Sequence, residues 1–133
     1  MGLRLTGALD VGALGAALEC LVDRHAVLRT VIDAPDGIAR GRVLPRGSFG
    51  SVLEEVDLRG SGGVPEREAE AVSVLLAFAS RAFDLACDVR LRALLVHVGP
   101  GEALLGLVAD HGSFDGSSFA VFGAELSALY DAA

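Results

Sequence analysis

Lysine is absent from the sequence, so arginine supplies all eleven basic side chains. Aspartate and glutamate outnumber them, and the formal net charge is -7 at pH 7. A chain this acidic offers no basic stripe that could neutralise phosphates, which argues against a nucleic-acid partner. The charge balance is compatible with part of an enzyme or with a surface that docks a partner, and it does not choose between them.

Cysteine is scarce, and long hydrophobic runs are missing. Cys20 and Cys87 lack the spacing of a metal site or a disulfide framework, which predicts two reduced, mostly buried thiols. None of the three histidines pairs with a cysteine or another histidine at metal spacing, so we expect no metal site. No run is long enough to cross a bilayer, and the N-terminus begins on a strand pattern instead of a secretion signal. We therefore expect a cytoplasmic protein that does not bind a membrane.

The remaining composition predicts one folded domain. Hydrophobic residues make up 52% of the chain and charged residues 22%, which is typical of a globular protein and not of a disordered one. A length of 133 residues is enough for one modest core, so we expect a single domain, residues 1–133.

Hydrophobic periodicity predicts a mixed order of strands and helices. The expected strands cover residues 3–7, 27–34, 39–44, 51–56, 90–98 and 103–109. The expected helices are a first one after an N-cap at Asp10, a second with Pro65 in its first turn and the stripe Ala69, Val72, Leu75, Leu76 and Ala79, and a third capped by Ser117 or Ser118. A mixed sheet covered by about three helices is the economical arrangement, an α/β fold of the α+β sandwich kind.

A sharp turn follows the most hydrophobic of these strands. Residues 103–109 carry no polar side chain, which predicts a strand buried on both faces, and Asp110 and His111 come directly after it. Asp115 and Gly116 then lead into the third helix. Catalytic residues often lie on a loop that a rigid strand holds in place. The His-x-x-x-Asp spacing also occurs at purely structural positions, so this pattern alone leaves both interpretations open.

Three further motifs accompany this one in a fixed order. They are Leu-Arg-Leu-Thr-Gly-Ala-Leu-Asp at 3–10, Arg-His-Ala-Val-Leu-Arg-Thr at 24–30 and Ala-Phe-Asp-Leu at 82–85. In this order and at these spacings, the chain resembles the N-terminal lobe of a nonribosomal peptide synthetase condensation domain. The resemblance extends from Leu3 to Tyr130 and covers only part of such a domain. It implies one lobe of a chloramphenicol acetyltransferase-like fold, in which two similar lobes form a V with a tunnel between them.

The resemblance implies an acyltransferase that forms an amide bond. An amine on one carrier-protein arm attacks a thioester on another, and both substrates hang on phosphopantetheine arms, so no cofactor is bound directly. The implied partners are peptidyl or aminoacyl carrier proteins, an adenylation domain and the C-terminal lobe of the condensation domain. A single lobe cannot hold both substrates, so the isolated chain is expected to be inactive.

The resemblance also assigns roles to residues of the motifs. His111 corresponds to the functional histidine and would take a proton from the amine or hold the amine in line. The pKa of an α-amino group is about 7.7–8.0, so positioning of the amine and stabilisation of the oxyanion count beside proton removal. Asp115 would form a structural salt bridge with Arg24 or Arg29. Gly116 either allows a special backbone conformation or is an ordinary turn glycine.

Three departures from the family pattern keep other functions open. Asp110 stands where the family has the first histidine of a pair, and a carboxylate there would favour the imidazolium form of His111, a poorer base. Ser117 replaces an aromatic residue, and the second lobe is not in this chain. The alternatives are a degenerate lobe that docks carrier or tailoring proteins, and a related acyltransferase with a small alcohol or amine acceptor. We expect His25 to be structural, His97 to be solvated and Phe83 to lie in the core.

Overall fold

The computed structural model describes residues 2–60, 62–110 and 116–132, without the side chains of 116–120. The chain forms two compact units, a first one of Met1–Asp10, Leu53–Ala82 and Arg92–Val108, and a second of Val11–Val52, Phe83–Leu91 and Ala109–Ala133. The elements in order are β1 (Gly2–Thr6), α1 (Val11–Arg24), a 3₁₀ turn η1 (Ala26–Arg29), β2 (Thr30–Asp33), β3 (Arg40–Val43), β4 (Leu53–Asp57), α2 (Val64–Ala79), β5 (Leu91–Gly99), β6 (Glu102–Ala109) and α3 (Gly116–Ala132). This confirms the α/β class.

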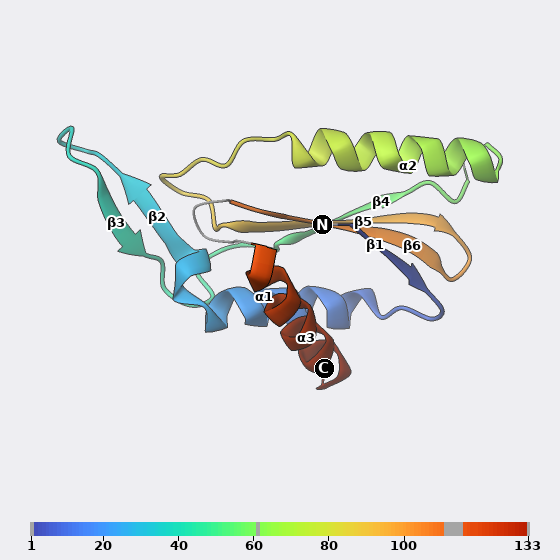
Figure 1. The fold of residues 1–133 in the computed structure, drawn as a ribbon, viewed down its shortest axis with the longest axis horizontal. Helices are drawn as coiled ribbons and strands as arrows, with labels where there is room; N and C mark the ends of the chain where they lie inside the picture. The colour runs from blue at the N-terminus through green and yellow to red at the C-terminus, as the bar shows by residue number, and fades with distance from the viewer. Residues whose placement is uncertain (1, 61, 111–115, 133) are drawn as a thin grey trace. The chain divides into compact units, whose positions relative to one another are not determined.

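A four-stranded mixed sheet forms the first unit, in the order β1-β6-β5-β4 (Figure 1). β1 pairs antiparallel with β6, and β4 pairs parallel with β5. β5 and β6 are joined by the two-residue turn Pro100-Gly101, where Gly101 has a φ of +65° that favours glycine. The predicted strand pair is therefore confirmed, with its loop end opposite the end that leads to Asp110.

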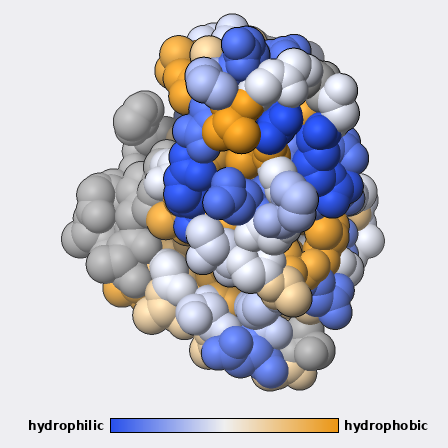
Figure 2. All heavy atoms as spheres, turned by 90° about the vertical axis from the view of Figure 1, so that its right-hand side faces the viewer, coloured by the Kyte–Doolittle hydropathy of each residue, from blue (hydrophilic) through white to orange (hydrophobic). Residues whose placement is uncertain are grey.

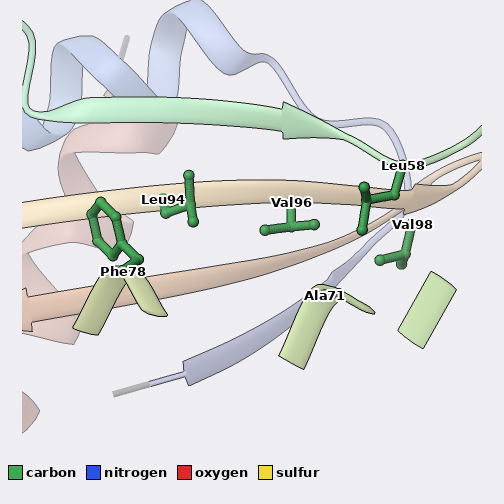
Figure 3. Packing of buried hydrophobic residues seen from close by; sticks show 6 residues of the cluster. All are labelled: Leu58, Ala71, Phe78, Leu94, Val96 and Val98. Atoms are coloured by element: carbon green, nitrogen blue, oxygen red, sulfur yellow. The ribbon is translucent and has the colours of Figure 1, made fainter. Parts of the chain in front are cut away.

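The hydrophobic core of the first unit lies between this sheet and α2. Alternate residues of β5 point to the helix, as the two-residue period of a strand requires. The cluster consists of Leu58, Ala71, Phe78, Leu94, Val96 and Val98 (Figure 3). Gly106 of β6 allows α2 to come close, because an added Cβ would lie 2.7 Å from Leu75 Cδ2.

Helix α2 begins as predicted but turns a different stripe to the core. Pro65 and Glu66 lie in its first turn, where the missing N–H of proline costs nothing and an acidic side chain favours the helix dipole. Ala71 and Phe78 are its buried residues, whereas Val72 and Leu76 are 51% and 65% exposed. The predicted stripe is therefore only partly right: its Leu75 packs against the core cluster, whereas Val72 and Leu76 are exposed, because two apolar stripes run side by side and only packing decides between them.

The exposed stripe borders an apolar groove of about 230 Å³. Val72 and Leu76 line it from α2, and Gly2, Gly106 and Val108 line it from the sheet. Leu104 and Val108 are only half-buried, so β6 is fully buried on one face and partly open on the other. The expectation of complete burial on both faces holds for one face only.

The second unit is built on α1, which packs against α3. Leu14, Leu18 and Leu21 of α1 and Phe122 and Leu126 of α3 are buried. The spacing of these residues on each helix is the three-to-four-residue period from which both helices were predicted. α1 begins at Val11, directly after the predicted N-cap Asp10.

The hairpin of the second unit differs from the prediction at its start. β2 and β3 form a separate two-stranded antiparallel sheet around the turn at Gly37, which has a φ of +80°. The strand expected over 27–34 begins only at Thr30, because Ala26–Arg29 form a 3₁₀ turn after α1. Leu28 and Val31 are both buried. The single strand was predicted because the segment is rich in valine and isoleucine, a composition that does not separate a 3₁₀ turn from the strand after it.

Two smaller expectations are also wrong. α3 begins at Gly116, so Ser117 and Ser118 lie inside the helix and neither is its N-cap. Cys20 and Cys87 are free, as predicted, but both are exposed. None of the helices among the described residues is long and apolar enough to span a membrane.

Alanine substitutions on the two apolar stripes of α2 test which stripe stabilises the packing of the helix on the sheet. Phe78→Ala should lower the free energy of unfolding by about 3–5 kcal/mol, because it removes a buried aromatic side chain. Leu76→Ala should change it by about 0.5 kcal/mol or less, because that side chain is exposed. Urea unfolding of the purified chain, followed by circular dichroism, measures both, and equal losses would contradict the assignment.

Candidate active site

The predicted catalytic motif begins where β6 ends. Asp110 follows the strand directly and is half-buried, and its main-chain N–H donates to the carbonyl oxygen of Arg90 at 3.1 Å. His111 and Asp115 lie outside the described residues, so their roles stay predictions. Gly116 is the first residue of α3. The strand thus delivers the chain to the motif as the sequence indicates.

The segment Arg24 to Thr30 brings an arginine and a histidine side chain to α3. His25 Nε2 lies 2.6 Å from Glu125 Oε2, and Arg24 Nη1 lies 3.9 Å from the same oxygen. The Arg24 side chain is 52% exposed. A surface pair of this kind contributes little to stability, whereas the shorter contact of His25 ties the end of α1 to α3. The geometry agrees with a structural role for His25.

Arg29 differs from Arg24 in its surroundings. It is 7% exposed, its Nε donates to the carbonyl oxygen of Val22 at 3.1 Å, and its Nη1 donates to that of Leu44 at 2.7 Å. No carboxylate forms an ion pair with it within the described part of the chain. Of the two arginines that the sequence offered as partners of Asp115, Arg29 is the buried one and Arg24 is already beside Glu125.

Arg90 is a residue that the sequence reasoning missed. It is only 2% exposed, and its guanidinium donates to the carbonyl oxygens of Thr30 and Leu85, both at 3.1 Å. Its main-chain N–H donates to the carbonyl oxygen of Leu28 at 2.8 Å. The only signal in the sequence is a single arginine between Val89 and Leu91 at the start of a strand, which by itself resembles an ordinary exposed position.

The Phe83-Asp84-Leu85 segment forms a turn that is stabilised from within. Asp84 Oδ1 accepts the N–H of Ala86 at 3.0 Å, and the carbonyl oxygen of Asp84 accepts the N–H of Asp88 at 2.8 Å. Phe83 is half-buried, so the expectation that it lies in the core is not met. The turn presents the Leu85 carbonyl oxygen, which accepts the N–H of Ile32 at 2.7 Å.

The Cys87 thiol takes part in this turn. Cys87 Sγ lies 3.1 Å from Asp84 Oδ2. This hydrogen bond raises the pKa of the Cys87 thiol to about 11, and it lowers the pKa of Asp84 together with the Ala86 N–H. The thiol is therefore exposed but protonated at neutral pH, which makes it a poor nucleophile.

The histidine of the first unit is placed differently from the prediction. His97 was expected to be solvated, but its side chain is 15% exposed and its Nε2 lies 3.0 Å from Glu55 Oε2. It lines a hollow of about 170 Å³ together with Arg59 and Glu102. The Arg59 guanidinium donates two hydrogen bonds to the Asp57 carboxylate. These side-chain bonds are the main reason why the pKa of Asp57 lies well below its usual range.

The described residues give no indication of a metal centre. No group of three or more histidine, cysteine, aspartate or glutamate side chains among them could hold a metal ion.

On the face drawn in Figure 2, hydrophilic residues gather around small, separate hydrophobic areas. Within the second unit, two buried arginines bond main-chain carbonyl oxygens, and one of them, Arg90, also accepts the N–H of Asp110 through its own carbonyl oxygen.

The reactivity of Cys87 tests the turn. At pH 8 the raised pKa reduces the thiolate fraction about a hundredfold relative to the ordinary value of 9.0, and a more basic thiolate regains about tenfold in nucleophilicity. Asp84→Asn should therefore make alkylation of Cys87 by iodoacetamide faster, by at most about tenfold, because the hydrogen bond to Asp84 is the largest cause of the raised pKa while burial and Asp88 remain. Mass spectrometry follows the rate, with Cys20 in the same sample as the internal control. An unchanged rate at Cys87 would contradict the hydrogen bond.

Comparison with known proteins assigns this framework to a family. The family model described as "Condensation domain" matches residues 1–133. The chain is 39% identical over 131 residues to "Probable non-canonical nonribosomal peptide synthetase (NRPS) CymA" of Salinispora arenicola, which covers 98% of this chain and 2% of that relative. The chain is therefore a small part of the length of such relatives.

Two solved structures resemble the chain in fold and in sequence. SgcC5 from Streptomyces globisporus matches with a TM-score of 0.83 and 32% identity, over 98% of this chain and 29% of that one. The X-domain from teicoplanin biosynthesis, solved in complex with OxyB, matches with a TM-score of 0.78 and 28% identity, over 97% and 26%. The family model matches the whole length of the chain, and the two structures resemble it in both sequence and fold. The chain therefore belongs to the condensation domain family.

Proposed function

We propose that this chain is the N-terminal lobe of a condensation domain that forms an amide bond between two carrier-bound thioesters. The observation that carries the proposal is the family match over residues 1–133, together with His111, Asp115 and Gly116 in the family's spacing after β6. The substrates would arrive on phosphopantetheine arms of carrier proteins, and a C-terminal lobe would supply the second wall of the tunnel. An adenylation domain would load the carriers.

His111 is the residue to which we assign the chemistry. The amine nitrogen of the acceptor attacks the thioester carbonyl carbon, and the C–N bond forms as the C–S bond breaks. The amine loses one proton, which the His111 imidazole takes and the departing sulfur finally receives. Because part of the amine is already neutral near pH 7.5, holding it in line contributes as much as removing its proton.

Asp115 is proposed to hold the loop through Arg29. The support is that Arg29 is buried and bonded to main-chain carbonyls, while Arg24 is half exposed and lies beside Glu125. A buried guanidinium is stable next to a carboxylate and costly without one. Gly116 at the start of α3 would let the chain turn from the loop into the helix.

Docking without catalysis is a second candidate, and two observations favour it. Asp110 occupies the place of the family's first histidine, where a carboxylate would weaken His111 as a base. The X-domain, which the chain resembles at 28% identity, was solved as a complex with OxyB. In this alternative the lobe would bind a tailoring enzyme or a carrier protein and would leave amide formation to another domain.

An alcohol or small amine acceptor is the alternative within acyl transfer. SgcC5 was crystallised with (R)-(-)-1-(2-naphthyl)-1,2-ethanediol and sucrose. A hydroxyl acceptor would use the same histidine, since an O–H proton must also be removed as the oxygen attacks the thioester.

Removal of the histidine tests catalysis directly. In the full-length enzyme that contains this chain, His111→Ala should reduce product formation from loaded donor and acceptor carriers at least tenfold, because positioned proton transfer typically contributes 10²–10⁴-fold. His97→Asn is the control histidine and should leave turnover unchanged. Turnover that His111→Ala does not alter would favour the docking function, and an ester product from an alcohol would favour the alternative acceptor.

A double-mutant cycle tests the partner of Asp115. Asp115→Ala and Arg29→Met should each reduce the free energy of unfolding by about 3–5 kcal/mol, because each leaves a buried charge unpaired. The double variant should lose clearly less than the sum. The matched cycle with Arg24→Met should be additive. Coupling of Asp115 to Arg24 instead of Arg29, measured by chemical denaturation, would reverse the assignment.

A further inference from the structure

We propose that Arg90 is a positioning residue that holds three of the sequence motifs to one another beside the catalytic loop. This inference rests on the proposed function for its effect on turnover, and on the second unit alone for its geometry. Arg90 belongs to none of the motifs themselves. It lies between the Phe83-Asp84-Leu85 turn and the start of β5.

The guanidinium of Arg90 connects two of the motifs. Nε donates to the carbonyl oxygen of Thr30, the last residue of the Arg24 to Thr30 motif, at 3.1 Å. Nη2 donates to the carbonyl oxygen of Leu85, in the Phe-Asp-Leu turn, at 3.1 Å. The same Leu85 oxygen accepts the N–H of Ile32 at 2.7 Å, so the guanidinium completes a junction between β2 and the turn.

The main chain of Arg90 adds the third motif. Its N–H donates to the carbonyl oxygen of Leu28 at 2.8 Å, and its carbonyl oxygen accepts the N–H of Asp110 at 3.1 Å. Asp110 is the residue before His111. Arg90 is thus bonded to all three motifs. Its side chain bonds Thr30 and Leu85, and its main chain bonds Leu28 and Asp110.

Burial of this arginine is costly, and the cost indicates a role. Arg90 is 2% exposed, no described carboxylate forms an ion pair with it, and Nη1 is buried without a hydrogen-bond partner among the described residues. A desolvated cation and an unpaired donor both destabilise the folded state. An apolar side chain of similar volume would occupy this place without the cost of desolvating a charge. What such a side chain cannot do is bond two carbonyl oxygens on separate segments.

The planar fork of arginine is what this junction requires. Its donors lie in fixed directions, so Nε and Nη2 reach two oxygens at once, whereas the ammonium of lysine is a single point on a flexible chain. Arg29, the other buried arginine among the described residues, bridges Val22 and Leu44 and does not bond the residue that precedes His111. The contact to Asp110 therefore sets Arg90 apart.

The expected consequence concerns the placement of the reacting groups. A displacement of about 1 Å in a catalytic group can reduce turnover about 10²-fold without loss of the fold. Arg90→Met retains length and apolar packing but loses both guanidinium bonds. In the full-length enzyme it should lower kcat at least tenfold and leave KM for the loaded carriers within about twofold, because Arg90 is 2% exposed and so offers no surface to a substrate.

Amide hydrogen exchange measures the junction without any assay of activity. In Arg90→Met, the amides of Ile32, Asp110 and residue 90 should exchange at least tenfold faster. The amide of His25, which bonds to the carbonyl oxygen of Leu21 at the end of α1, should keep its rate. Arg90→Lys preserves the charge and serves where the methionine variant folds poorly, and it should accelerate the same amides.

Arg67→Met is the matched control. Arg67 on α2 also bridges two carbonyl oxygens, those of Val98 at 2.7 Å and Gly62 at 3.0 Å. Its replacement removes the same kind of bonds from the first unit, so it should leave the exchange of Ile32 and Asp110 and the kcat unchanged.

Each outcome of these measurements decides the proposal. Faster exchange confined to the junction, with a lower kcat and an unchanged KM, supports it. Uniform acceleration that includes α1 would make Arg90 an ordinary stabilising residue and overturn the proposal, as would unchanged turnover in an active enzyme. If the parent enzyme forms no product at all, the proposed function fails, and the exchange pattern alone decides whether Arg90 holds the junction.

Discussion

The second unit depends on the satisfaction of main-chain carbonyl oxygens where its helices and strands end. Val22 is in the last turn of α1, where carbonyl groups have no partner within the helix, and Arg29 Nε bonds to it. Thr30 begins β2 and Leu85 lies in a turn, and Arg90 bonds to both. Buried main-chain groups must be paired, so these two arginines replace the bonds that regular structure cannot provide.

This constraint connects the local structure to the proposed chemistry. The loop after β6 needs a fixed starting point, and Asp110 obtains one from the Arg90 carbonyl oxygen. His25 and Glu125 tie the end of α1 to α3, the helix that follows the loop. The motifs that identify the condensation domain family thus consist in large part of framework residues. A family match over the whole chain is consequently a statement about this framework, and the proposed catalysis would need His111 and a second lobe in addition.

Sequence periodicity was sufficient for most elements of the fold and insufficient for their faces. α1, α2 and the β5–β6 pair were predicted because long apolar patterns with clear starts and turns allow few alternatives. On α2, however, Val72 and Leu76 compete with Ala71 and Phe78 for the core, and the pattern cannot rank two adjacent stripes. The 3₁₀ turn at Ala26–Arg29 was missed because a short apolar run fits a strand equally well.

For the candidate site too, the sequence is sufficient for some features and only the tertiary structure decides others. The sequence by itself determined the family and the order of the motifs, and it predicts His111, Asp115 and Gly116 as site residues, because these inferences depend on residue types at short spacings along the chain. Only the tertiary structure distinguished the buried Arg29 from the exposed Arg24, placed His97 against Glu55 and revealed Arg90. Burial and hydrogen-bond partners arise from segments far apart in the chain, such as residues 28, 85 and 110 around Arg90, and no local pattern records which of them meet.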